Sequence, residues 1–200
     1  MRWLAFPKMA LSLLLAALAA LALVGINEAG YRQSSIALAE IDAAQKVRSV
    51  LNQLLQNILD AETGQRGFLL TGEAAYRQPY DNAIKEIDGN LASLREQYAG
   101  RPAETAQLAE LSKHVLRKVS EMDMSVRLRS DGKEDAWKFV ITTDVGREEM
   151  DSIREKARGL VELSNKTLHD SQTQVMLSLR LARFGTSIVA LAALFAFFLY

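Results

Sequence analysis

The sequence predicts an all-α protein: an up-down-up-down four-helix bundle with two long membrane-connected helices, flanked by two transmembrane helices. Three observations support this fold class. Apolar residues recur at intervals of three and four over most of the chain, as on the buried face of an amphipathic helix. The chain has no run of alternating β-branched residues that would indicate a strand. An apolar stretch lies near each end of the chain.

The composition agrees with this class and excludes several functions. The chain has 24 basic and 24 acidic residues, so its charge does not favour a nucleic-acid partner. It has no cysteine, which excludes a disulfide scaffold and thiolate chemistry. We therefore expect no nucleic acid, no metal site and no cofactor.

The two ends of the chain predict its membrane topology. Residues 1–8 carry two basic side chains, and residues 9–26 are uncharged and just long enough to cross a bilayer. A cleaved signal peptide is the alternative, although the apolar core of such a peptide is usually shorter, about 7–15 residues. The positive-inside rule places residues 1–8 in the cytoplasm and residues 27–182 outside. Residues 183–200 form the second transmembrane helix, and we expect the natural protein to continue beyond them into a cytoplasmic domain.

Four long helices are expected between the membrane segments. They cover about residues 28–61, 73–98, 103–129 and 146 onward, and a short helix covers residues 133–143. Glycine- and proline-containing stretches separate them. The first and fourth helices are longer than the others, which predicts a two-helix stalk below the bundle.

Residues 62–80 form the most unusual stretch of the chain. Gly64, Gly67 and Gly72 fall within nine positions. Glycine weakens a helix interior by roughly 1 kcal/mol relative to alanine. The cluster therefore indicates a turn or a close contact between helices. Thr71 is predicted to cap the helix that follows.

This stretch resembles the signature of the third type of CHASE domain, the cyclase/histidine-kinase-associated sensory extracellular domains. The residues that carry the resemblance are Asp60, Glu62, Thr63, Gly64, Gln65, Arg66, Gly67, Phe68, Leu69, Leu70, Thr71, Gly72, Tyr76, Pro79 and Tyr80. A weaker similarity, to the segment that opens the last helix of the family, lies at Gly146, Met150, Asp151, Ile153 and Arg154. With the flanking membrane segments, the resemblance covers nearly the whole chain. It implies a helical sensory module between two membrane helices, without implying a known ligand.

The first motif has two interpretations. In the functional one, Glu62, Gln65, Arg66, Tyr76 and Tyr80 line a polar site for a small ligand or an ion. In the structural one, which we favour, Arg66 pairs with Glu62 one helical turn away. The glycines then let helices approach, and the two tyrosines belong to the core. A partly buried pair would make Arg66 important for the stability of the domain.

The sequence contains no recognisable catalytic or metal centre. Glu110 and His114 lie one turn apart, but neither an HExxH motif nor a third ligand accompanies them, and we expect His114 to be a solvated surface residue. His169 precedes an aspartate, yet it lies in the segment expected outside the membrane, where no kinase domain or ATP reaches it. Glu148 and Glu149 are typical of the first turn of a helix. We expect these 200 residues not to be an enzyme.

The expected function is a sensory input module that passes a small-molecule or protein stimulus to a cytoplasmic output domain. By resemblance, the output is a histidine kinase; a diguanylate or adenylate cyclase, a chemoreceptor, or a stand-alone membrane-anchored scaffold are the alternatives. We expect a parallel homodimer in a bacterial plasma membrane. Ser164, Ser171 and Ser178 recur on the inward face of the fourth helix. Because a buried serine contributes far less than a leucine, we expect a weakly held stalk that can switch between packings.

Overall fold

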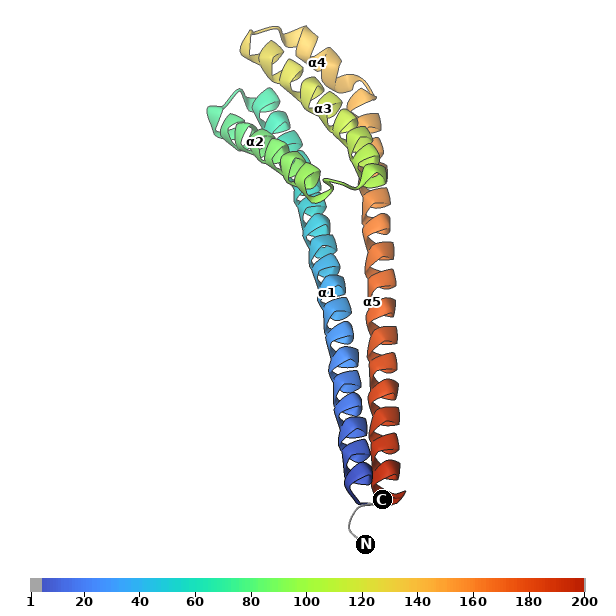
Figure 1. Ribbon diagram of the computed structural model, residues 1–200. Coiled ribbons are helices and arrows are strands. Elements are labelled where there is room, and N and C mark those ends of the chain that lie inside the picture. Colours follow the sequence, from blue (N-terminus) through green and yellow to red (C-terminus); the bar gives the residue numbers. More distant parts are fainter. Residues whose placement is uncertain (1–4, 200) are drawn as a thin grey trace. The chain divides into compact units, whose positions relative to one another are not determined.

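The computed structural model describes the backbone of residues 5–199 and the side chains of residues 14 and 16–195. Within these residues the chain forms five helices and no strand (Figure 1). They are α1 (Ala5–Thr71), α2 (Ala74–Gln97), α3 (Pro102–Ser130), α4 (Glu134–Thr142) and α5 (Val145–Leu199). The all-α class is confirmed, whereas the up-down-up-down order of a bundle remains a prediction.

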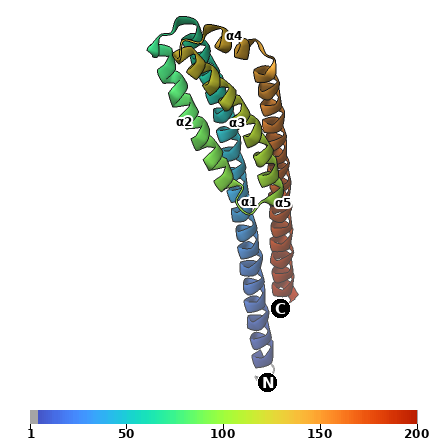
Figure 2. The same cartoon turned by 90° about the horizontal axis from the view of Figure 1, so that it is seen from above.

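The chain divides into two compact units. The core unit comprises Ala43–Lys166, and the stalk unit comprises Met1–Asp42 with Thr167–Tyr200. The long helices α1 and α5 contribute residues to both units, while α2, α3 and α4 belong to the core unit (Figure 2). Each unit has an interior of its own, and the two interiors differ in composition.

The interior of the core unit is one hydrophobic cluster drawn from four helices. It contains Leu51, Leu54 and Ile58 from α1, Ile87, Leu91 and Leu94 from α2, Leu108, Leu111 and Met122 from α3, and Ile153 and Leu160 from α5, all of them buried. These are the stripes that the three/four spacing predicts. Burying each such side chain stabilises the fold by about 1.5–3 kcal/mol relative to leaving it exposed.

Glycines in the left-handed region make the turns between the first four helices. Gly72, Gly100 and Gly132 have φ values of 75°, 80° and 72° and stand between α1 and α2, α2 and α3, and α3 and α4. Residues with a Cβ atom seldom adopt this conformation, whereas glycine does so readily. These turns lie where the sequence predicts breaks between helices.

The end of α1 differs from the prediction. The first helix was expected to stop near residue 61, but α1 continues to Thr71. Only Gly72 of the three clustered glycines makes the turn, because Gly64 and Gly67 lie inside the helix. The Thr71 hydroxyl accepts a hydrogen bond from the Glu73 amide, but the residue at the N-cap of α2 is Glu73 itself. The prediction that Thr71 caps this helix is therefore wrong.

The interior of the stalk unit consists of small residues. Among its described side chains, those that are buried are Ala37, Ser171 and Ser178. The Ser171 hydroxyl donates a hydrogen bond to the Glu40 carboxylate, and the Ser178 hydroxyl donates to the Val175 carbonyl. Gly30 also lies close to the other helix, since a Cβ atom there would sit 3.7 Å from that of Ala182. The expected small-residue stalk interface is present.

One of the described helices, α5, contains a window long and apolar enough to cross a membrane. The helical stretch that contains this window, Val145–Phe195, ends within the expected second transmembrane segment, residues 183–200. The expected first segment, residues 9–26, is helical, but several of its side chains lie outside the described residues, as do residues 1–4 of the expected cytoplasmic terminus. Two flanking transmembrane helices remain a prediction.

Candidate functional site

Two of the motif glycines lie directly against α2, Gly64 against its backbone and Gly67 against the Tyr76 ring. A Cβ atom on Gly64 would lie 2.9 Å from the Tyr80 amide nitrogen and 3.1 Å from the Tyr76 carbonyl oxygen. A Cβ atom on Gly67 would lie 2.3 Å from the Tyr76 ring. The 2.9 Å and 2.3 Å distances are shorter than a Cβ atom allows, so a side chain at Gly64 would push the α2 backbone away and one at Gly67 would displace the Tyr76 ring. These glycines serve helix packing, as the structural interpretation of the motif predicts.

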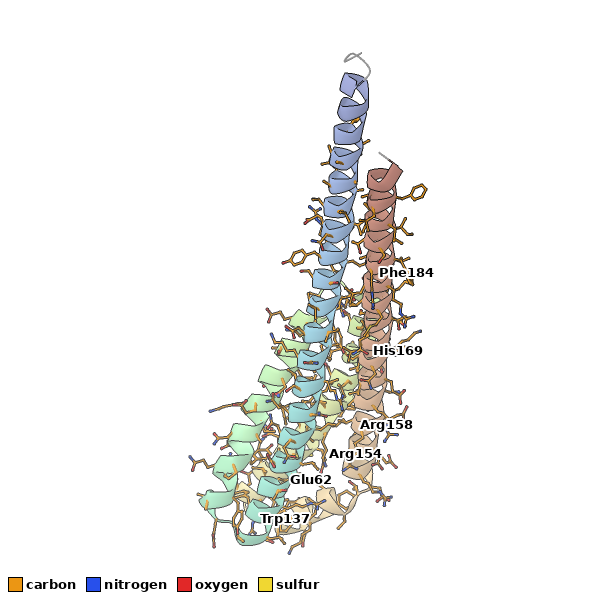
Figure 3. All side chains as sticks on the ribbon, turned by 90° about the horizontal axis from the view of Figure 1, so that it is seen from below. Glu62, Trp137, Arg154, Arg158, His169 and Phe184 are labelled. Atoms are coloured by element: carbon orange, nitrogen blue, oxygen red, sulfur yellow. The ribbon has the colours of Figure 1, made fainter. Side chains whose placement is uncertain are left out.

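The opposite side of the motif faces a cavity in the core unit, which we call the charged cavity. Its volume is about 680 Å³. It is lined by Leu59, Glu62, Gln65, Arg66, Leu69, Leu70, Lys118, Glu121, Ile141, Thr142, Thr143, Asp144, Gly146, Arg147, Met150 and Arg154. The cavity therefore brings together residues of both sequence motifs, and Figure 3 labels Glu62 and Arg154 on its two long helices.

A buried lysine lies at the centre of the charged residues of this cavity. The Lys118 side chain is only 3% exposed. Its Nζ atom donates a hydrogen bond to Glu121 Oε2 at 3.0 Å and lies 3.6 Å from Glu62 Oε1. Glu62 and Glu121 are themselves 20% and 13% exposed. A buried ammonium is costly without carboxylate partners, and here each of two helices supplies one.

Gln65 lines the charged cavity and makes a buried hydrogen bond to α3. Its Nε2 atom donates to Ser125 Oγ at 2.6 Å, and the Ser125 hydroxyl donates to the Met122 carbonyl at 2.7 Å. Both side chains are buried. Because an unpaired amide would carry a desolvation cost at this position, the bond holds α1 and α3 in one register. Gln65 is thus a structural part of the cavity wall.

Arg66 forms the predicted ion pair but is not buried. Its Nη2 atom lies 2.8 Å from Glu62 Oε1, and its side chain is 69% exposed. Glu62 Oε1 also lies 3.6 Å from the buried Lys118 Nζ, so Glu62 keeps one ion-pair partner when Arg66 is removed. The expected importance of Arg66 for stability required a partly buried arginine, and this condition is not met; exposed pairs of this kind contribute about 0–1 kcal/mol.

The second motif divides between the core and the cavity. Met150 and Ile153 are buried in the hydrophobic cluster, while Asp151 and Arg154 form an exposed ion pair at 3.2 Å. Gly146 lies directly against the buried charges: a Cβ atom there would sit 2.7 Å from Glu121 Oε2 and 2.8 Å from Lys118 Nζ. Glycine at this position leaves room for the Lys118–Glu121 hydrogen bond.

The tyrosines of the first motif do not line the charged cavity. Tyr80 is 3% exposed and belongs to the core, as predicted. Burial raises the pKa of its phenol well above the ordinary value, and Asp123 and Asp81 raise it further, so it stays neutral at physiological pH. Tyr76 is 43% exposed rather than core, and its ring covers Gly67. With Thr63, Gly64 and Pro79 it lines a separate shallow groove.

The remaining residues of the first motif have structural positions. Phe68 and Leu69 are buried, and the Arg77 guanidinium lies 5.7 Å from the centroid of the Phe68 ring. Leu70 is exposed at the edge of the charged cavity. The Thr71 hydroxyl donates to the Gly67 carbonyl within α1.

The two histidines occupy different environments. His114 is half-buried, with Nδ1 2.6 Å from Glu149 Oε2, so the expectation of a solvated surface residue is wrong. Glu149 also lies 3.5 Å from Arg117 and ties α5 to α3. His169 is exposed on α5 (Figure 3). In the described part of the chain, no three His, Asp or Glu side chains are grouped so that they could hold a metal ion.

The residues that sequence reasoning missed are Lys118 and Glu121 on α3. They belong to no motif, but the sequence does contain a signal for Lys118. The buried stripe of α3 runs through Leu111, Val115, Met122 and Val126. Lys118 falls three residues after Val115 and four before Met122, on the same face. A charged residue on an apolar stripe predicts a buried charge with partners.

The stalk serines lie where they were expected. Ser164, Ser171 and Ser178 are all buried, Ser164 in the core unit and the other two in the stalk unit. The sequence spacing of seven keeps them on one face of α5. Their burial supports a role at a helix interface.

The comparisons with known proteins agree with these motifs. The family model of the CHASE3 domain, a sensory extracellular domain found in histidine kinases and cyclases, matches residues 37–174. No curated protein and no solved structure matches the chain. The match covers more than half of the chain and includes both glycine-containing motifs, the charged cavity and the five helices in part or in full. The chain therefore belongs to the CHASE3 domain family.

Proposed function

We propose that this chain is the extracytoplasmic input module of a transmembrane sensor histidine kinase. The observation that carries the proposal is the CHASE3 match on residues 37–174, in a chain whose α5 continues into an apolar segment long enough to cross a membrane. An extracellular sensory domain needs such a connection to reach a cytoplasmic output. Histidine kinases are among the proteins in which this family occurs.

The proposed topology follows the charges of the chain. Residues 1–8 lie in the cytoplasm, residues 9–26 and 183–200 cross the bacterial plasma membrane, and residues 27–182 lie outside as a four-helix bundle on a two-helix stalk. Arg2 and Lys8 favour the cytoplasmic side for the N-terminus. The chain acts as a parallel homodimer, because small residues at Ala182, Thr186 and Ala190 repeat every four positions, as they do in contacts between membrane helices.

The signal passes to the membrane through α1 and α5. The stalk unit buries small and polar side chains, of which Ser171 and Glu40 share a hydrogen bond. Such an interface gains little from burial, since a leucine contributes about 1.5–3 kcal/mol and a serine far less. Two packings of the stalk can therefore have similar free energies, so that a stimulus with a modest preference shifts their populations.

The test fuses residues 1–200 to a histidine-kinase core and replaces Ser164, Ser171 and Ser178 together with leucine. The triple variant is expected to fix autophosphorylation in one state, on or off, because the added apolar area stabilises one packing. The matched control places leucine at Asn165 and Gln172, which are exposed on the same helix, and should leave the response intact. A triple variant that still responds over the normal range would falsify the switching mechanism.

A further inference from the structure

We propose that the charged cavity binds a small organic oxyanion, a carboxylate or a phosphate, with Lys118 on its inner wall and arginines on its rim. This inference rests on the proposed sensory function, for which it names the chemical class of the stimulus. It depends on four features of the cavity: a buried ammonium, exchangeable arginines, the start of α5, and a suitable volume.

The first feature is the hydrogen-bonding capacity of Lys118. An ammonium group has three N–H donors. Glu121 accepts one at 3.0 Å, while Glu62 lies at 3.6 Å, beyond a good hydrogen bond. Buried donors are nearly always satisfied in proteins. An oxygen atom of a ligand in the cavity can accept one of the remaining N–H groups.

The same lysine argues against a cationic ligand. Its ammonium lies within 4 Å of both Glu62 and Glu121, where a metal ion or an amine would otherwise bind. The chain therefore supplies its own cation to these carboxylates. A second cation would have to displace a side chain that is 97% buried, or accept like-charge repulsion at close range.

The second feature is the set of arginines on the rim. Arg66, Arg147 and Arg154 line the cavity, and each pairs with a carboxylate three or four residues away on the chain surface. Exposed pairs of this kind contribute little, so a guanidinium can exchange its carboxylate for a ligand. Arginine binds carboxylate and phosphate groups through two parallel hydrogen bonds. Four cationic residues against three carboxylates leave the lining with a net charge of +1.

The third feature is the start of α5. This helix begins at Val145, and Gly146, its second residue, lines the cavity. The helix dipole favours an anion at that end, while the amides of Arg147 and Glu148 donate to the Asp144 carbonyl. The fourth feature is the volume of about 680 Å³, which lies within the usual range of small-molecule sites, about 300–1,000 Å³.

The experiment measures thermal unfolding and binding heat for the full chain in lipid nanodiscs. The probes are succinate, citrate, L-aspartate and inorganic phosphate, each compared with sodium chloride at equal ionic strength, and choline serves as the cationic probe. We expect at least one oxyanion to raise Tm by several degrees with saturable binding, because a ligand of the folded state stabilises it. Choline should have no effect. Whether the carboxylates or phosphate raise Tm more shows which of the two classes of oxyanion the cavity binds.

Two variants test whether such binding uses this cavity. The double variant Arg66→Gln with Arg147→Gln removes exposed charges, so Tm without a probe should not change, while Kd should rise about tenfold or more. The matched control, Arg32→Gln with Arg158→Gln, removes two exposed arginines outside the cavity and should leave Kd unchanged. The proposal is overturned if no oxyanion raises Tm above the chloride control, or if the rim variant binds the probe as tightly as the parent.

The outcome for this site is separate from that for the sensory function. If a probe binds but does not change autophosphorylation of the kinase fusion, the binding site is supported and the sensory function is contradicted. If the fusion responds to an external stimulus but the chain binds none of the oxyanions, the sensory function is supported and the binding site is contradicted.

Discussion

The core unit and the stalk unit are built from the same two long helices but have different interiors. In the core unit, α1 and α5 bury Leu51, Leu54 and Leu160. In the stalk unit the described residues of the same helices bury Ala37, Ser171 and Ser178. The same helical spacing therefore gives different packing energies in the two units. The size of the buried residues on the inward stripe determines how much apolar area each helix pair buries.

The largest expected effect is the loss of a buried leucine from the core unit. Leu94→Ala should lower the free energy of unfolding by about 2–5 kcal/mol, because Leu94 is fully buried and its removal leaves a cavity. The control is Leu177→Ala in the stalk unit, which should change it by less than about 0.5 kcal/mol, since Leu177 is exposed. Denaturant unfolding followed by circular dichroism measures both. Equal losses would show that burial of Leu94 does not determine the effect.

A smaller effect is expected from the buried charge of the core unit. Lys118→Met should destabilise the chain by roughly 3 kcal/mol, because Glu121 loses its buried partner. Arg66→Ala is the comparison and should change stability by less than about 0.5 kcal/mol, since that side chain is exposed and Glu62 keeps Lys118. The same unfolding measurement decides between them. If Arg66→Ala lowers the free energy of unfolding more than Lys118→Met does, Arg66 rather than Lys118 is the stabilising partner of the carboxylates.

The smallest effects concern glycines within the helices of the core unit. Gly64→Ala should destabilise by about 1–3 kcal/mol, because its Cβ atom would overlap the backbone of α2 at Tyr80. Gly89→Ala should instead stabilise by about 0.5–1 kcal/mol, because a Cβ atom there meets nothing within 4 Å and alanine favours the helix. Thermal melts of the two variants should shift in opposite directions. Shifts of the same sign would rule out close packing as the reason for Gly64.

The all-α class and most helix boundaries could be predicted from the sequence, because the boundaries coincide with residues that interrupt helices. Pro102 begins α3, and Gly100 and Gly132 make turns through their left-handed backbone. The error at the end of α1 has a physical cause. A glycine inside a helix and a glycine at a turn look the same in the sequence, and only the approach of Tyr76 and Tyr80 distinguishes Gly64 and Gly67 from Gly72.

Only the residues that α1 and α5 contribute to the candidate site could be predicted from the sequence. Glu62 and Gly146 belong to sequence motifs, and both line the charged cavity. Lys118 and Glu121 come from α3 and belong to no motif. They pair one helical turn apart, but their positions beside Glu62 and Gly146 depend on α1 and α5. The burial of a charge depends on neighbours far away in the chain, which residue spacing does not contain. The lysine on an apolar stripe was the one available signal.

The contact of Gly146 with Lys118 and Glu121 has a consequence for the evolution of the family. A side chain at position 146 would occupy the space of the hydrogen bond between the other two residues. Alanine or a larger residue there would require the flexible ends of both neighbouring side chains to move. The three positions are therefore expected to change together rather than one at a time, although Gly146 lies 25 residues after Glu121 and 28 after Lys118. Because the three residues share one space, we expect the effect of a substitution at one of them to depend on the residues at the other two.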